Sequence, residues 1–237
     1  QWLAVFALVP FFALNIFFGS LDIPATKVVE ILFSSSEAND TSAFIILQSR
    51  LPQAIVAMLC GASLSVAGLL LQTAFRNPLA GPSIFGITSG ASLAVALVTL
   101  LLGGSATALG FQLSIVVAAF VGASIVTAIV LALSSIVRSN TMLLIVGIMI
   151  GYIASSAITL LNYFASEEGV RNYLLWGMSN FGDVSLQQLP LFTILSLVGI
   201  LASLMLIKPL NTLLLGDRYA ENLGINIRRV RNQLLIV

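Results

Sequence analysis

Side chains that could perform catalysis are few in this sequence, and they lie outside its apolar tracts. The 237 residues include ten Lys and Arg, nine Asp and Glu, one cysteine and no histidine. Nucleophilic catalysis needs a nucleophile beside a base, and a metal site needs clustered histidine, cysteine or carboxylate ligands. The uncharged tracts contain neither combination, and the sequence has no G-x-x-x-x-G-K-[ST] loop for nucleotide phosphates. We therefore expect no enzyme active site, no ATPase site and no bound metal in this chain.

The single cysteine and the net charge exclude further classes of function. Cys60 lies between Leu59 and Gly61 in an apolar run, where a free cysteine usually behaves as a small packing residue. One cysteine cannot form an internal disulfide. A net charge of +1 without histidine supports neither a nucleic-acid surface nor a histidine proton relay.

The clearest polar interruption of the apolar sequence is FRNPLAGPSIFG, residues 75–86. Pro78 and Pro82 each remove a backbone donor and disfavour helix in the preceding residue, while Gly86 allows close backbone approach. Asn77 can accept local hydrogen bonds. Broken backbone at membrane depth is tolerated only where protein or a water-filled cavity satisfies it. The stretch is therefore either a plain turn at one membrane face or the lining of a wet passage.

The apolar tracts that must position these residues are long enough to cross a bilayer. Hydrophobic residues make up 59% of the chain, charged residues 8%, and the mean hydropathy is +1.08. Because a hydrocarbon core of about 30 Å takes roughly 20 helical residues, the tract from Asn77 to Val137 must fold back, at Gly103, Gly104 and Gly110. We expect an all-α, polytopic transmembrane helix bundle of six to seven helices. Their expected ranges are 2–18, 51–74, 83–102, 111–137, 141–165 and 185–207, with a seventh beginning after Arg231.

The two ends of the sequence need separate interpretations. The first apolar tract, Gln1 to Leu21, could be a cleaved secretion signal, but it lacks a basic start and a small-x-small cleavage site. We expect it to be a helix of the mature protein. At the other end, the apolar run after Arg231 stops at Val237, too short to cross a membrane. We therefore expect the chain to be part of a longer polytopic protein.

The charged residues between the expected helices predict an orientation. One alternating set of connections holds seven bases and two acids, and the other holds three bases and seven acids. By the positive-inside rule the first set is cytoplasmic, and so is the N-terminus. No expected helix carries a charge in its interior, which weakens an ion-coupled carrier or a channel, the alternative class of function. The seven bases of the first set are Arg76, Arg138, Lys208, Arg218, Arg228, Arg229 and Arg231.

Small residues recur at four-residue spacing in the apolar tracts. Such pairs let helix backbones approach closely and pack by dispersion, since lipid supplies no hydrophobic drive between helices. We expect these positions to pack the bundle. The pairs are Gly61 with Ser65, Gly86 with Gly90, Gly147 with Gly151, and Gly151 with Ser155.

A resemblance to a known family is carried first by residues 50–93, RLPQAIVAMLCGASLSVAGLLLQTAFRNPLAGPSIFGITSGASL. This segment closely resembles the permeases of type II ABC importers, which take up iron-siderophores, haem and cobalamin. In that family an R-L-P-R start, a G-A-x-L-x-x-x-G helix, a Q-x-x-x-x-N-P-L-A-x-P loop and a G-x-x-x-G-A run occur in this order. The resemblance continues through LLIVGIMIG, WGMSNFGDVS at 176–185 and LNTLLLGDRYAENLGINIRRVR at 210–231. It implies that residues 1–237 are roughly the first two-thirds of a single transmembrane permease domain, which has ten helices when complete, and that 208–231 hold its cytoplasmic coupling loop.

The resemblance also implies a translocation pathway between two permease copies or halves. In the family, the cytoplasmic end of this pathway is closed by the loop between the second and third helices and by the start of the fifth. Without the resemblance, Asn140 fits a helix cap. The positions that match the closure are Asn77, Leu79, Asn140 and Thr141.

Residues 211–231 contain a second informative pattern. Leu215, Tyr219 and Leu223 recur every four residues, and Gly216 and Gly224 flank the segment, which predicts a short amphipathic helix resting on a partner. The pattern alone also fits a helix on the membrane surface. In the family, this loop forms coupling helices that dock in the ATP-binding subunit. The resemblance therefore implies a coupling role for Leu215, Gly216, Asp217, Ala220, Leu223 and Gly224.

On the outer side, the arginines of the R-L-P-R start dock a soluble substrate-binding protein in the family. Arg50 matches the first arginine, but Gln53 replaces the second, so one charged contact is missing. The alternative role for Arg50 is an interfacial anchor that extends its charge to the membrane surface.

The resemblance therefore implies a transport subunit without a cofactor of its own, with ATP and magnesium bound by a partner. The expected partners are a second permease copy, two ATP-binding subunits, a periplasmic or lipid-anchored substrate-binding protein and membrane lipid, with no nucleic acid. We expect the chain in the bacterial inner membrane, with its N-terminus in the cytoplasm.

Overall fold

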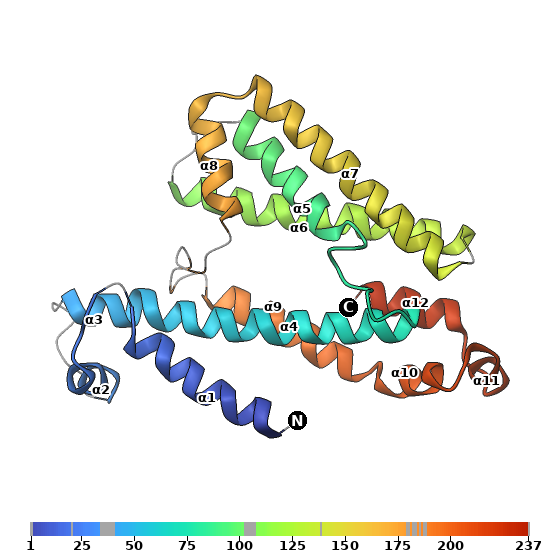
Figure 1. Ribbon diagram of the computed structural model, residues 1–237, viewed down its shortest axis with the longest axis horizontal. Coiled ribbons are helices and arrows are strands. Elements are labelled where there is room, and N and C mark those ends of the chain that lie inside the picture. Colours follow the sequence, from blue (N-terminus) through green and yellow to red (C-terminus); the bar gives the residue numbers. More distant parts are fainter. Residues whose placement is uncertain are drawn as a thin grey trace. The chain divides into compact units, whose positions relative to one another are not determined.

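The structure is a computed structural model that describes residues 2–19, 21–33, 41–101, 108–137, 139–178 and 189–236, with residues 181, 184 and 186. Within these ranges the regular elements are helices, as Figure 1 shows, which confirms the all-α class. Two of them, η1 and η2, are single π-type turns. The helices are α1 (Trp2–Phe17), α2 (Ala25–Phe33), α3 (Thr41–Ile45), η1 (Ile46–Arg50), α4 (Leu51–Phe75), α5 (Ile87–Ala96), η2 (Leu97–Leu101), α6 (Ala108–Ile136), α7 (Asn140–Phe164), α8 (Glu167–Gly177), α9 (Leu189–Leu204), α10 (Ile207–Leu214), α11 (Asp217–Asn222) and α12 (Ile227–Ile236).

Several helices in the described part of the chain have the length and apolar composition of membrane spans. Thr41–Phe75, Leu113–Ser134 and Thr141–Phe164 each qualify alone, and Leu189–Leu204 with Ile207–Leu214 qualifies as a bent pair. Leu8–Phe17 and Ile87–Leu100 are shorter apolar helices. In the three single spans, only 17–22% of the most apolar window is buried. Side chains this apolar and this exposed need lipid or further protein around them, so the chain is a membrane protein.

The second expected helix begins at Thr41 rather than at Leu51, so that boundary was wrong. Pro52 has no N–H, and its ring would clash with the carbonyl four residues earlier in a regular α-helix. The π-type turn Ile46–Arg50 lies directly before it, and the N–H of Leu51 donates to the carbonyl of Ile46. This wider turn lets the helix continue through the proline.

Two short helices, α2 and α8, were not expected from the sequence because their segments contain charges. In α2, Val28 and Ile31 are buried on one face, as in an amphipathic helix. At the start of α8, the Ser166 hydroxyl accepts a hydrogen bond of 3.2 Å from the N–H of Gly169, and two acidic residues occupy the first turn. Both features stabilise a helix N-terminus.

Two other boundaries also differ. The third expected helix begins at Ile87 rather than at residue 83, because turns occupy the chain up to Gly86. The last helix begins at Ile227 rather than after Arg231. There the Asn226 side chain accepts a hydrogen bond of 3.1 Å from the N–H of Arg229, a local cap that an apolar-length criterion overlooks.

The chain divides into two compact units: residues 1–65 with 180–201, and residues 66–179 with 202–237. In the first unit, α1, α2, α3, η1 and the start of α4 bury a small apolar core. Its buried members are Ile16, Val28, Ile31, Ala43, Ile46 and Ala54.

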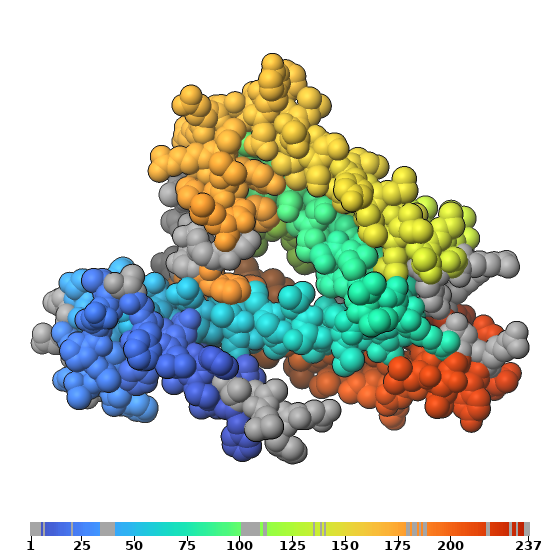
Figure 2. All heavy atoms as spheres, viewed as in Figure 1, coloured from blue at the N-terminus to red at the C-terminus, as the bar shows by residue number. Residues whose placement is uncertain are grey.

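The second unit holds the larger core, which joins the end of α4, helices α6 and α7, and helices α10 to α12. In Figure 2, α7 and α8 (yellow and gold) lie over part of α5 (green). A Cβ atom on Gly90 of α5 would lie 2.8 Å from the carbonyl oxygen of Gly122 on α6, so these two backbones are in close contact. The buried members of the core are Leu70, Leu71, Ala74, Phe75, Ala80, Phe85, Val126, Val130, Leu143, Leu144, Leu206, Leu210, Leu213, Ala220, Val230 and Leu234.

Candidate functional site

Residues 76–86, which we call the gate loop, form a hydrogen-bonded turn after α4. Arg76 has a φ of 48°, which is rare for a residue other than glycine and reverses the chain directly after the helix. The Asn77 side chain then accepts a hydrogen bond of 2.9 Å from the N–H of Leu79, and its carbonyl accepts one of 3.0 Å from Ala80. The side chain of Leu79 is 71% exposed. The loop therefore holds a large apolar side chain away from the core on an ordered backbone.

The last residues of this loop are in backbone contact with α7 at Gly147. A Cβ atom on Gly147 would lie 2.5 Å from the carbonyl oxygen of Ile84 and 2.6 Å from the Cα of Phe85. A Cβ atom on Gly86 would lie 2.8 Å from the carbonyl oxygen of Gly147. Larger residues at these two glycines would push α7 away from the gate loop.

The other glycines expected to pack helices differ in their surroundings. A Cβ atom on Gly151 would make a contact of 3.3 Å with the hydroxyl of Ser89. Around Gly61 no atom of the described chain lies within 4 Å of such a Cβ, and the Ser65 hydroxyl donates to its carbonyl at 2.7 Å. Close helix packing at Gly61 stays a prediction.

The first turn of α7 contains the second pair of expected closure residues. Thr141 is exposed, whereas the side chain of Asn140 lies outside the part that the structure describes. Ser139 occupies the N-cap, and its hydroxyl accepts a hydrogen bond of 3.4 Å from Met142, so the interpretation of Asn140 as the cap was wrong. Leu143 and Leu144, one turn further, share the buried core with Phe85 of the gate loop.

Residues 215–224, which we call the coupling elbow, contain the expected short helix as α11. Gly216 has a φ of 123° and Gly224 a φ of 81°, a backbone conformation that favours glycine, so the two residues mark the ends of the helix. Leu215 and Leu223 are 66% and 58% exposed, whereas Ala220 is fully buried. The elbow thus presents apolar side chains outward and is attached to the core through Ala220.

The residues expected to couple to an ATPase therefore differ in their exposure. The exposed leucines are available to a partner, but Ala220 faces the core of its own chain. The side chain of Asp217 lies outside the described residues. The coupling role of the whole set stays a prediction.

A polar contact joins the gate loop to the helix before the elbow. The guanidinium of Arg76 donates a hydrogen bond of 2.6 Å from Nη2 to the carbonyl oxygen of Leu213, in the last turn of α10. From the sequence, Arg76 is counted only among the bases expected on the cytoplasmic side, and Leu213 has no expected role. The only available signal was a base directly after an apolar helix, which does not identify a partner 137 residues away.

Arg50 is buried in the first unit, at 5% exposure. Its Nη1 donates to the carbonyl oxygens of Ile16 at 3.1 Å and Phe17 at 3.2 Å, and its Nη2 donates to that of Leu21. The first two carbonyls belong to the last turn of α1, where helical partners are lacking and a positive charge is favourable. A docking ion pair needs an accessible guanidinium, and this one is engaged within the chain. The docking role stays a prediction.

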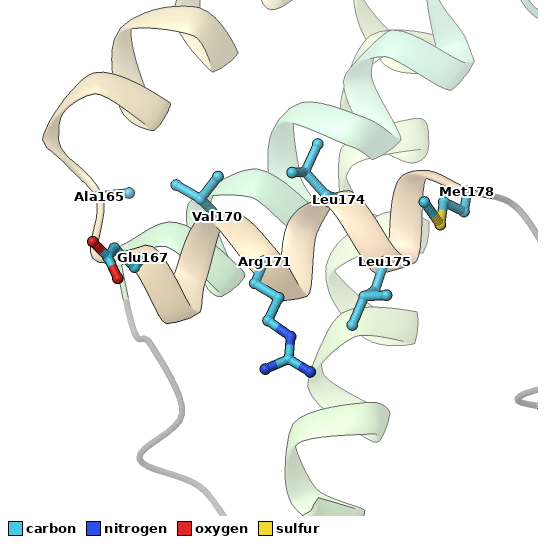
Figure 3. Close-up of a pocket in the computed structure, with 7 residues that line it drawn as sticks. All are labelled: Ala165, Glu167, Val170, Arg171, Leu174, Leu175 and Met178. Atoms are coloured by element: carbon cyan, nitrogen blue, oxygen red, sulfur yellow. The ribbon is translucent and has the colours of Figure 1, made fainter.

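An apolar groove lies along α8, as Figure 3 shows. Val170 and Leu174 point to one side of the helix, and Arg171 and Leu175 point to the other. Nearby, the rings of Tyr173 and Trp176 stack with their centroids 6.1 Å apart, and burial raises the pKa of the Tyr173 phenol. The lining is suited to apolar contact rather than to chemistry. It consists of Ala165, Glu167, Val170, Arg171, Leu174, Leu175 and Met178.

Comparison with known proteins agrees with these features. Residues 7–237 match the FecCD transport family. The hemin transport system permease protein HmuU of Yersinia pestis is 33% identical over 220 residues, which are 92% of this chain and 66% of that protein. The vitamin B12 import system permease protein BtuC of Serratia proteamaculans is 35% identical over 207 residues, 86% of this chain and 60% of that protein.

A solved structure is similar over nearly the whole chain. It is an inward-facing conformation of a transporter assigned to the metal-chelate type of ABC transporters, with a TM-score of 0.74 and 25% identity. The match covers 99% of this chain and 72% of that one. The chain thus spans 60–66% of the length of the two curated relatives named above. The resemblance seen in the sequence is confirmed, and the chain belongs to the FecCD transport family.

Proposed function

We propose that this chain is a membrane-spanning permease subunit of an ATP-driven importer, which moves a metal chelate into the cytoplasm. The chelate classes that fit are an iron-siderophore, haem and cobalamin. The chain supplies the pathway and its closure at Asn77, Leu79, Asn140 and Thr141. A separate subunit binds ATP and magnesium and supplies the energy.

The observation that carries this proposal is the two-sided coupling elbow. Tyr219 of α11 and the flanking Leu215 and Leu223 are 55%, 66% and 58% exposed, and α11 is too short to be stable alone. Ala220 fixes the same helix to the core that contains Phe85 of the gate loop. An exposed apolar patch attached to the closure in this way fits a protein partner that drives the gate, and membership of the FecCD transport family supports the same function.

The complete assembly follows from the same proposal. It contains a second permease copy across the pathway, two ATP-binding subunits at the elbows and a substrate-binding protein on the outer side. We place it in the bacterial inner membrane with the N-terminus of this chain in the cytoplasm, in accord with the distribution of bases.

The test is reconstitution of the full-length permease in proteoliposomes, with and without the ATP-binding subunit that copurifies with it. Haemin, cyanocobalamin and a ferric hydroxamate siderophore are each offered with the binding protein. We expect uptake of one of them that requires both ATP and the ATP-binding subunit. Uptake by the permease alone, driven by an ion gradient, would establish the carrier alternative instead.

A further inference from the structure

We infer that Arg76 is a positioning residue that ties the gate loop to the helix leading into the coupling elbow, so that loop and elbow move as one body. The inference rests on the proposed function for its mechanistic meaning. Its structural basis lies wholly within the second unit of the chain.

The polar part of the connection is the hydrogen bond of 2.6 Å from Arg76 Nη2 to the Leu213 carbonyl oxygen. That carbonyl also accepts a hydrogen bond of 3.2 Å from the N–H of Gly216, the first glycine of the elbow. A carbonyl oxygen has two lone pairs, so both donors can be accommodated. The guanidinium charge also faces the C-terminal end of α10, where a cation is favourable. Arg76 therefore holds the point at which α10 turns into the elbow.

The apolar part surrounds this hydrogen bond. The rings of Phe75, the last residue of α4, and Phe85, the last but one of the gate loop, have centroids 4.6 Å apart. Both rings belong to the buried core that also contains Leu213 and Ala220. The end of α4, the gate loop at Ala80 and Phe85, and the inner face of the elbow thus share one packed cluster. Figure 1 shows the loop after α4 passing beside α12, which contributes to the same cluster.

The backbone of Arg76 adds a constraint. Its φ of 48° is unfavourable for a residue with a Cβ, and such conformations persist where the surroundings hold them. Glycine would adopt this conformation more readily, but glycine has no guanidinium to reach the Leu213 carbonyl. The arginine at this position thus combines the turn at the end of α4 with a contact to the elbow.

The first test measures the connection without any ATP-binding subunit. Spin labels are placed on the full-length permease at Leu79 and Leu223, two exposed positions in the second unit, in a Cys60→Ala background. We expect a narrow distance distribution between the labels in the parent protein and a broader one in Arg76→Ala. The matched control is Arg171→Ala, which removes an exposed arginine of the same unit and should leave the distribution unchanged. An equally narrow distribution in Arg76→Ala overturns the inference.

The second test uses the complex with its ATP-binding subunit. The labelling rate of Leu79→Cys by a maleimide is compared in the nucleotide-free and the ATP-vanadate states, together with ATP hydrolysis. In the parent we expect ATP-vanadate to change the labelling rate about fivefold or more. A fivefold change is the lower end of the range that coupling between two sites of a protein usually shows. In Arg76→Ala the ratio falls toward one while hydrolysis continues. A parent-sized ratio in Arg76→Ala overturns the inference.

The two failures are distinguishable. A parent complex that shows no nucleotide response contradicts the proposed function, and the distance distributions still decide the role of Arg76. If Arg76→Ala does not fold, Arg76→Gln and Arg76→Lys replace it in both tests. Lysine retains a charged donor and should restore part of the nucleotide ratio, whereas glutamine should not. Equal ratios for these two variants would contradict the charged contact.

Discussion

Replacing Gly147 by alanine should separate α7 from the gate loop. The added Cβ would lie 2.5 Å from the Ile84 carbonyl oxygen, whereas ordinary contacts begin at 3.4 Å. The obstructing atoms belong to backbone, including the Cα of Phe85 at 2.6 Å, so no flexible side chain can move aside. Overpacking of this kind costs about 1–3 kcal/mol, and alanine returns about 1 kcal/mol of helix propensity relative to glycine. Because backbone must move, we take the upper part of the range and expect a net loss of about 1–2 kcal/mol.

The control for this variant is Gly68→Ala. Gly68 lies within α4 in the same unit, and apart from the backbone of its own helix no atom of the described residues lies within 4 Å of an added Cβ. No steric clash then opposes the higher helix propensity of alanine, so the free energy of unfolding should stay equal or rise by up to about 1 kcal/mol. The two free energies of unfolding are measured by reversible denaturation of the full-length permease in mixed micelles, followed by tryptophan fluorescence. A loss of about 1–2 kcal/mol changes the unfolding equilibrium about 5- to 30-fold, which this assay resolves.

The reasoning is refuted if Gly147→Ala is as stable as Gly68→Ala. That result would mean either that the contact is absent or that the gate loop moves away from α7 at no cost. The labelling rate of Leu79→Cys separates two ways of reaching it. An unchanged rate would show that the contact itself is absent, and a changed rate would show that the loop has moved freely.

Three further predictions test other parts of the molecule. Arg50→Ala leaves carbonyls at the end of α1 without donors and should lower the free energy of unfolding by about 1–3 kcal/mol. The control Arg171→Ala should change that free energy by less than about 0.5 kcal/mol. Equal free energies for the two variants would favour the docking role for Arg50. Leu223→Asp should abolish capture of the ATP-binding subunit and leave the melting temperature of the permease unchanged. Ala220→Asp should lower that melting temperature. The reverse pattern would contradict the two-sided elbow. Ser166→Ala removes the N-cap of α8 and should cost about 0.5–2 kcal/mol, visible as faster hydrogen exchange confined to α8.

Features set by local rules were predictable from the sequence. Long uncharged tracts give helices because their backbone groups must be satisfied within the segment in a membrane. The elbow helix was predictable because Gly216 and Gly224 flank a segment with four-residue apolar spacing, and the structure confirms positive φ at both glycines. Fold class and family followed from patterns of this kind.

Features set by tertiary context were not predictable. The second span begins at Thr41 and continues through Arg50, the charge after which the uncharged tract begins. Helix α8 forms from a segment with two acids and an arginine, which an apolar-length criterion assigns to a connection. The resemblance implied that Arg50 docks a binding protein, with an anchor at the membrane surface as the alternative, yet three carbonyl oxygens accept hydrogen bonds from its guanidinium inside the chain. Partners of this kind are separated along the sequence and are visible only after folding.

In the proposed function, the division of the elbow into two faces determines how a partner acts on the gate loop. A six-residue helix has too few internal hydrogen bonds to hold its own orientation, so the core beneath it sets that orientation. Ala220 is fully buried, and a force applied to exposed Leu223 must therefore pass into the cluster that contains Phe85. Packed clusters transmit displacement because they lack space to absorb it. The short helix thus suits the transfer of motion because it cannot move independently of the loop.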